Sequence, residues 1–211
     1  GISARFNYTY GMAVDSAGNV YVADYADHAI RKITAGGVVT TLAGSPGNPG
    51  SADGTGSAAR FNYPLGVAVD QGGSVFVADT GNHTIRKITA SGAVTTLAGS
   101  PGNGNFADGT GGNARFNSPR GIVVDTAGNV YVTDYGSIIR RITPGGMVTT
   151  LAGSANSEGS ADGTGGQARF WAPAGLAIDG DGKLYVADSD NNTIRKGLPI
   201  YPGTAPSLLT A

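Results

Sequence analysis

The chain has 211 residues, of which 40% are hydrophobic and 14% charged, and its formal net charge is −1. A charge this small gives no bulk attraction to nucleic acid or to an anionic membrane surface, so neither is an expected partner. The absence of cysteine excludes disulfide bonds and thiolate metal sites. No apolar run reaches the roughly 18 residues of a membrane-spanning helix, so no membrane insertion is expected.

Four copies of one motif divide the chain. Each copy opens with Ala-Arg-Phe, followed by Asn in the first three and by Trp171 in the fourth. The copies recur at intervals of about 55 residues, and a fixed period of this size indicates a repeat architecture. The predicted domain is one array over residues 1–211, with repeats at 4–58, 59–113, 114–167 and 168–211. The last repeat loses the pattern after Lys196, and its final strand is either residues 207–209 or absent.

Each repeat reads as four short strands, and the second copy shows them most clearly. The strands are expected at residues 66–70, 75–79, 84–89 and 93–99, because β-branched and apolar residues fill them and Gly, Asn, Asp or Ser stand at every break. The first run is small and apolar, which suits an inner edge, and the fourth is rich in Thr, which suits an outer edge. Four antiparallel strands per repeat predict an all-β fold, a β-propeller of four-stranded blades.

The connection from the fourth strand to the next repeat is long and has its own motif. Ala-Asp-Gly-Thr-Gly occurs three times and is followed by Ala-Arg-Phe. Loops longer than about 12–15 residues are usually functional or disordered, but a repeated one argues for a fixed conformation. We expect an Asp-Gly turn in which the Arg clamps loop carbonyls or the Asp, while the Phe is wedged between blades. In a blade, these loops share one face with the turns between the second and third strands.

Val-Phe-Val-Ala-Asp at residues 75–79, followed by Asn-His-Thr-Ile-Arg-Lys-Ile at 82–88, resembles the NHL repeat. Close versions stand at residues 21–33 and 185–196, and the resemblance covers nearly the whole chain. It implies a β-propeller, usually of six blades. The long Ala-Asp-Gly-Thr-Gly loops look like those of secreted or cell-surface bacterial proteins, which implies an extracellular location.

The chain has four repeats, whereas the resemblance implies a propeller of usually six blades. Three alternatives for the complete architecture are therefore open. The chain is part of a longer propeller, or it associates with other copies to extend the array, or it closes alone with four blades. An open array exposes the apolar flank of a blade and unpaired strand edges, both of which promote self-association.

Most repeated polar residues favour structural roles. An Asp ends the second strand of every repeat and an Arg follows in the third, so a hairpin brings them together. His28 and His83 occupy the same position in two repeats, which favours a packed, turn-stabilising imidazole over a metal ligand. A catalytic carboxylate would be expected once and not in every blade.

No cofactor is expected, although calcium has two candidate sites. Asp179 and Asp181 resemble the start of a calcium loop, but Lys183 stands where a ligand is needed and no Glu follows. A turn between two strands explains them better. The second candidate is the set of loop aspartates, Asp53, Asp108 and Asp162.

Positions that differ between the copies are the candidates for a binding site, because a site breaks the repeat. The set predicted on the loop face is Tyr10, Tyr25, Arg120, Tyr135 and Trp171. Aromatic and Arg side chains are typical of protein and glycan recognition. The leading hypothesis is a non-catalytic scaffold that binds protein or glycan there. The alternatives are ordinary drift of surface residues, a structural or self-assembling module that works through blade flanks or edges, and a metal-dependent lyase or hydrolase.

Overall fold

The computed structural model describes residues 4–197 and 207–209, which form four antiparallel sheets. Blade 1 contains β1 (Thr9–Val14), β2 (Val20–Asp24), β3 (Ala29–Ile33) and β4 (Val39–Gly44). Blade 2 contains β6 (Pro64–Val69), β7 (Val75–Asp79), β8 (Thr84–Ile88) and β9 (Ala93–Gly99). Blade 3 contains β11 (Ile122–Val124), β12 (Val130–Asp134), β13 (Ile138–Ile142) and β14 (Met147–Gly153). Blade 4 contains β16 (Pro173–Ile178), β17 (Leu184–Asp188), β18 (Thr193–Gly197) and β19 (Ser207–Leu209).

These boundaries confirm the all-β propeller and the strand assignments of the second repeat. The divergent last strand is also present, because β19 pairs with β18 through Lys196 and Gly197. Residues 198–206, where the sequence pattern is lost, lie outside the described residues. Short 3-10 turns follow several strands: η1 (Gly56–Ala58), η2 (Thr80–Asn82), η3 (Gly111–Asn113), η4 (Gly165–Gln167) and η5 (Ser189–Asn191).

Blades 2, 3 and 4 each have a fifth, outermost strand, which corrects the four-stranded prediction. These strands are β5 (Gly54–Thr55), β10 (Gly109–Thr110) and β15 (Gly163–Thr164), and they pair with β9, β14 and β19. Each comes from the tail of the preceding repeat, so a blade does not coincide with its sequence repeat. The pairing satisfies backbone groups at the edge of the Thr-rich strand, which would otherwise be open to another chain.

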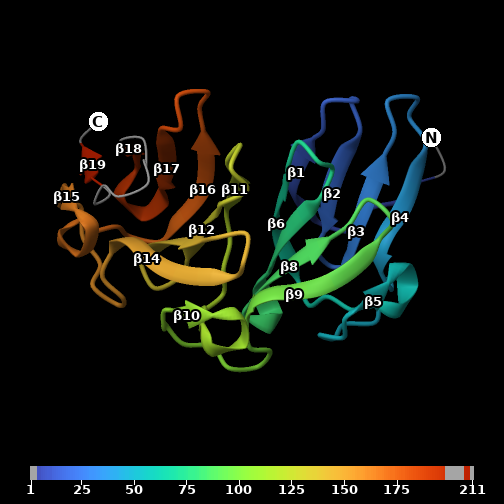
Figure 1. Cartoon of the computed structure of the whole chain (residues 1–211), viewed down its shortest axis with the longest axis horizontal. Helices are drawn as coiled ribbons and strands as arrows, with labels where there is room; N and C mark the ends of the chain where they lie inside the picture. Colours follow the sequence, from blue (N-terminus) through green and yellow to red (C-terminus); the bar gives the residue numbers. More distant parts are fainter. Residues whose placement is uncertain (1–3, 198–206, 210–211) are drawn as a thin grey trace.

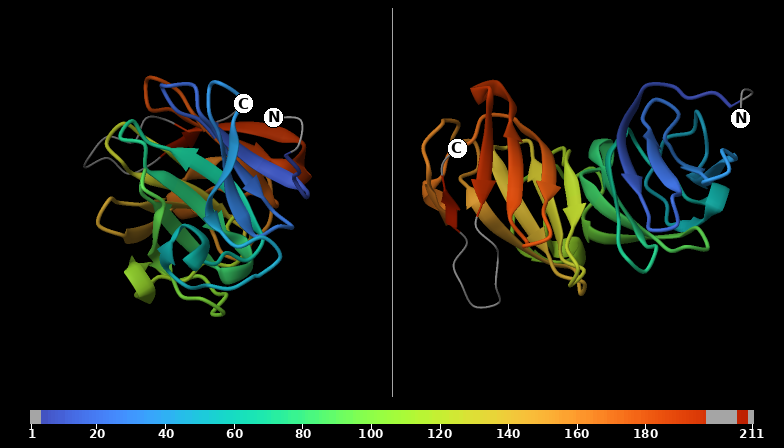
Figure 2. Two further views of the ribbon diagram at one scale, coloured as in Figure 1. Left: turned by 90° about the vertical axis from the view of Figure 1, so that its right-hand side faces the viewer. Right: turned by 90° about the horizontal axis from the view of Figure 1, so that it is seen from above.

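The blades follow one another in chain order along an arc, with blade 1 at the blue end and blade 4 at the red end (Figures 1 and 2). Inner strands β1, β6, β11 and β16 contact their neighbours in that order. A separate apolar core fills each of the three junctions between consecutive blades.

The outer flanks of the two end blades are uncovered, so four blades do not close a ring by themselves. Met12 and Val14 of β1 are exposed, and so is Ile194 of β18, although the equivalent residues in interior positions are buried or partly buried. The described residues therefore do not favour the alternative in which the chain closes alone.

Candidate functional site

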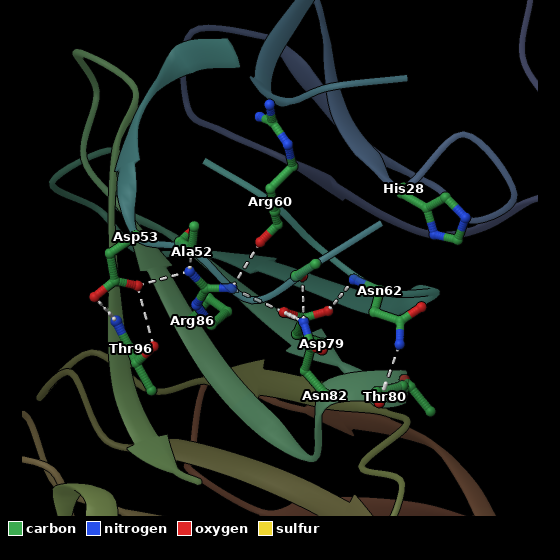
Figure 3. A network of polar contacts seen from close by, with 12 residues as sticks. His28, Ala52, Asp53, Arg60, Asn62, Asp79, Thr80, Asn82, Arg86 and Thr96 are labelled. Carbon is green, nitrogen blue, oxygen red and sulfur yellow. Dashed lines mark hydrogen bonds and ion pairs between the residues drawn. The ribbon is translucent and has the colours of Figure 1, made fainter. Parts of the chain in front are cut away.

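A buried polar network supports the loop face at the end of each blade, and blade 2 shows it completely (Figure 3). Asp79 ends β7 and accepts hydrogen bonds from the Asn62 N–H (2.7 Å) and the Asn82 side-chain amide (2.7 Å). Arg86 of β8 lies 2.9 Å from the same carboxylate, and both side chains are fully buried. Arg86 also donates to the Arg60 carbonyl oxygen (2.9 Å). The predicted pairing of Asp and Arg across the hairpin is confirmed.

The same arginine anchors the long loop that precedes the blade. Arg86 Nη2 donates to Asp53 Oδ1 (2.6 Å) and to the Ala52 carbonyl oxygen (3.1 Å). Asp53 in turn accepts from the Thr96 hydroxyl on β9. Blades 3 and 4 repeat the arrangement, with Arg140 on Asp108 (2.9 Å) and Arg195 on Asp162 (2.5 Å).

The loop arginine and phenylalanine behave as the sequence predicts. Arg60 donates to the Ser57 and Ala59 carbonyl oxygens, so it clamps loop carbonyls and not the loop aspartate. Phe61 is fully buried between blades 1 and 2, with the Arg86 guanidinium 5.2 Å from its ring centre. The Gly-Thr pair that follows the aspartate forms an outer strand, so the predicted Asp-Gly turn is not present.

Burial dominates the electrostatics of the network. It raises the pKa of Asp79 to about 6 and that of Asp134 to about 7, against the lowering effect of the adjacent arginines and backbone N–H groups. Both carboxylates pair with an arginine of their own blade. Their side chains are fully buried, so solvent does not reach them. They stabilise the fold and are poorly placed to act on a substrate.

The two histidines join consecutive blades at the loop face. His28 Nδ1 accepts from the Tyr63 N–H (3.1 Å), and His83 Nδ1 accepts from the Ser118 N–H (3.0 Å). Both residues adopt left-handed backbone angles at the end of the turn. Burial lowers the pKa of both imidazoles, which favours the neutral form that can accept. The structural role predicted for them is confirmed.

A β-bulge at the start of the inner strand positions the residues that differ between blades. The pairing of β1 with β2 skips between Thr9 and Met12, and β6 and β16 have the same irregularity. Bulges of this kind re-aim side chains next to binding sites. The residue before each strand glycine lies at the mouth of the central opening: Tyr10, Leu65, Arg120 and Ala174.

These residues line one cavity of about 560 Å³, a volume in the range of small-molecule sites. Tyr25 lines it as well, and the Tyr10 and Tyr25 rings meet edge to face with centres 5.0 Å apart. Apart from Arg120, the rest of the lining consists of Leu65, Ala174 and glycine residues. The cavity thus has an aromatic wall on blade 1 and a cation on blade 3.

The remaining two predicted residues lie outside the cavity lining. Tyr135 is exposed and lies beneath the Arg120 guanidinium, 4.4 Å from its ring centre, so it holds the cation at the cavity edge. Trp171 is partly exposed beside the end of β17, where its backbone N–H donates to Asp188 (2.7 Å). The structure therefore brings Tyr10, Tyr25, Arg120 and Tyr135 to one mouth and leaves Trp171 at a separate point.

Tyr63 belongs to the same aromatic surface and was not predicted. Its ring lies 4.8 Å from Tyr25 and 4.5 Å from His28, so the aromatic wall runs on from blade 1 to blade 2. The signal was in the sequence, because this position also differs between copies, being Tyr8, Tyr63, Ser118 and Ala172. We define the aromatic ridge as Tyr10, Tyr25 and Tyr63.

Comparison with known proteins agrees with the geometry. The NHL repeat model matches residues 61–88 and 170–196, and the Teneurin NHL domain model matches residues 101–161. NHL repeat-containing protein 2 of Bos taurus is 31% identical over 87% of this chain, and Teneurin-3 of Mus musculus is 30% identical over 88%. The chain belongs to the NHL-repeat β-propeller family. It spans 29% of the first relative and 8% of the second.

Several solved structures share the fold over nearly all of this chain. A Bacteroides thetaiotaomicron protein of unknown function has a TM-score of 0.75 at 25% identity, covering 90% of this chain and 47% of that one. An auxiliary nutrient binding protein of Bacteroides ovatus gives 0.70 at 23% identity, with 94% and 50% covered. A streptogramin B lyase gives 0.66 at 16% identity, with 98% and 55% covered. Binding proteins and enzymes both use this fold, so the fold does not choose between them.

The two candidate calcium sites of this NHL chain are occupied by protein donors. Asp179 accepts from the Asp181 and Lys183 N–H groups and from the Tyr185 hydroxyl, which makes it the anchor of a strand turn. The three loop aspartates lie on different blades and pair with arginines. Over residues 4–197 and 207–209, no three His, Asp or Glu side chains converge as a metal site would require. The described part also contains no helix with the length and apolarity to span a bilayer.

Proposed function

We propose that this NHL propeller is a non-catalytic scaffold that binds a protein segment or a glycan on its loop face. The observation that carries the proposal is the cavity at the mouth of the central opening, where the aromatic ridge faces Arg120. Flat aromatic rings offer a large contact area at low entropic cost, and such residues together with Arg dominate recognition surfaces.

The chemistry of the mouth favours a ligand with an anionic group. Arg120 makes no ion pair among the described residues, and its guanidinium is held on the Tyr135 ring at the cavity edge. A carboxylate of an acidic side chain or of a uronic acid would find there the planar, bidentate donor that suits it. The rings of Tyr10 and Tyr25 would contact the apolar part of the same ligand.

The repeated carboxylates do not favour an enzyme. Asp79 and its counterparts are buried against arginines, and the cavity itself is lined by no Asp, Glu or His. The lyase among the structural neighbours is similar at an identity that supports the shared fold alone. Binding without chemistry is therefore the function that the geometry supports best.

An extracellular or cell-surface location accompanies this proposal. It follows from the resemblance of the long loops to those of secreted bacterial proteins, and a nutrient-binding protein among the structural neighbours is in keeping with it. Proteolytic shaving of intact source cells tests it, because a surface protein is cleaved while the cells stay sealed.

The binding proposal is tested on arrays of acidic and neutral glycans and peptides, followed by calorimetry on the hits. Tyr25→Ala and Arg120→Ala should each weaken binding by about tenfold or more, because both remove a central contact. Arg120→Lys should recover only part of the affinity, since Lys lacks the planar fork. The control is Val38→Ser, an exposed change in a turn at the far end of blade 1. Equal affinities for all four variants would refute the site.

A further inference from the structure

The three junctions between blades are one interface built three times. Each pairs the trailing flank of a blade with the leading flank of the next. The trailing flank presents an Ile on the third strand, small residues and one aromatic ring: in blade 1, Tyr21, Ala23, Ile30 and Ala43. The leading flank presents the wedge Phe and mostly β-branched residues: in blade 2, Phe61, Val67, Val75, Val77, Ile88 and Val94. The equivalent residues fill the other two junctions.

Close backbone approach fixes the register of these junctions. Gly11, Gly66 and Gly121 lie so near the next blade that a Cβ would collide with the carbonyl oxygen of Leu65, Arg120 or Ala174. Side chains add hydrogen bonds across the junctions, among them the Thr133 hydroxyl to the Ala174 carbonyl oxygen (2.7 Å). The junction is therefore specified by shape as well as by apolar area.

Both halves of this interface remain uncovered at the two ends of the array. On the leading flank of blade 1, Phe6 is 39% exposed, whereas Phe61, Phe116 and Phe170 are fully buried. Met12 and Val14 beside it are 68% and 62% exposed.

The trailing flank of blade 4 is uncovered in the same way. Ile194 is 60% exposed, whereas Ile30, Ile85 and Ile139 are fully buried. Gly175, the counterpart of the three close-approach glycines, faces open space, because a Cβ there meets only Ala187 of its own blade at 3.7 Å.

We propose that the leading flank of a second copy packs on the trailing flank of blade 4, continuing the junction that the chain already forms three times. The two exposed flanks belong to one chain, and they present the wedge Phe, the third-strand Ile and the glycine of the pair that matches elsewhere. Contiguous exposed apolar patches of this kind mark interaction sites, and the net charge of −1 opposes contact between copies very little. The contact joins unlike surfaces, so two copies can use both of their ends in a closed pair.

This association goes beyond the proposed ligand binding, although Gly175 at the proposed contact also lines the cavity. The exposed apolar residues of the two flanks, Phe6, Met12, Val14 and Ile194, do not line the cavity. Failure of one proposal therefore leaves the other standing, since Tyr25 and Arg120 do not lie on either exposed flank.

The experiment is the mass of the purified chain by light scattering after gel filtration and by native mass spectrometry, over a dilution series. We expect a dimer or a higher head-to-tail multiple of the 21.0 kDa chain. A monomer at every concentration would overturn the proposal.

Three variants locate the contact, and circular dichroism confirms that each is folded. Met12→Glu on the leading flank and Ile194→Glu on the trailing flank should each abolish association, whereas Val38→Glu, an equally exposed apolar residue away from both flanks, should not. Gly175→Ala is the sharpest variant, because the single chain has room for the methyl group and a docked copy does not. Association that survives Gly175→Ala would contradict the proposed register.

Mixing the variants distinguishes head-to-tail contact from a symmetric one. Met12→Glu chains keep an intact trailing flank and Ile194→Glu chains keep an intact leading flank. An equimolar mixture should therefore form a one-to-one dimer through the single remaining junction, although neither variant associates alone. A mixture that stays monomeric, while the wild type is dimeric, would overturn the head-to-tail arrangement.

Discussion

Blades 1 and 2 have the same aspartate and arginine at the same strand positions, yet the two pairs have different surroundings. In blade 2, Arg86 is fully buried and bonds Asp79, the loop aspartate Asp53 and two backbone carbonyls. In blade 1, Arg31 lies 3.5 Å from Asp24 and is 14% exposed, and one oxygen of Asp24 has no hydrogen-bond partner. The difference arises because blade 2 receives the long loop of the preceding repeat.

The comparison shows that a blade is completed by its neighbour. The preceding repeat supplies the outermost strand, the loop aspartate and an apolar flank, and only blades 2 to 4 receive all three in the described structure. The stability of a repeat protein is approximately the sum of the intrinsic stability of each repeat and the interaction energy between neighbouring repeats. Here the same long loop contributes to both.

The largest effects are expected from the arginine pair. Arg86→Ala leaves Asp79 buried without its cation, and removing one partner of a buried pair costs about 3–5 kcal/mol. Arg31→Ala should cost clearly less, because its pair is longer and partly hydrated. Urea denaturation of both variants measures the difference, and equal losses would mean that the loop contributes nothing to the network.

The wedge phenylalanines give a matched comparison of apolar packing. Phe116→Ala removes a fully buried ring between blades 2 and 3 and should lower the free energy of unfolding by about 3–5 kcal/mol. Phe6→Ala, measured on the monomer by dilution, should cost far less because no blade covers that ring. A similar loss at both positions would indicate that Phe6 is covered in solution.

A small effect is expected from the loop aspartate alone. Asp53 is half exposed, so its pairing with Arg86 is screened by water and Asp53→Asn should cost about 0.2–1 kcal/mol. The same substitution at Asp108 is the matched control in blade 3. A loss as large as that of Arg86→Ala would show that the loop depends on this single charge.

The smallest effect is a pH dependence at a blade junction. The folded-state pKa of His83 lies below its ordinary value of about 6.5, so the unfolded chain binds more protons between the two values. The stabilisation is complete above pH 6.5 and is lost as the pH falls through 6.5 towards the folded-state pKa. His83→Asn should reduce the loss of stability between pH 7 and pH 5, relative to wild type.

Asn192 occupies the same left-handed position in blade 4, which makes it the control. Asn192→Ser should leave the pH profile of the free energy of unfolding unchanged. If His83→Asn also left it unchanged, the imidazole would be protonated equally in both states and the proposed acceptor role would be wrong.

Much of the candidate site was accessible to sequence reasoning. Variation at repeated positions selected Tyr10, Tyr25, Arg120 and Tyr135, and the structure brings these to one mouth because the same loop position recurs at the same end of each blade. The position of Tyr63 varies between the copies in the same way, and its ring extends the aromatic wall of the mouth. Trp171 is separate because its backbone is held on Asp188 at the end of β17, and its side chain does not line the cavity.

The sequence by itself determined the repeat, the strands and the residues that recur in every blade. Periodicity and turn residues are local properties, and four copies of one pattern reinforce each other. The tertiary structure decided which repeat completes which blade, where the loop aspartates bind and that the end flanks stay open. These features depend on contacts between segments some 30 to 40 residues apart, and no local pattern encodes which of two neighbouring edges a short strand will join.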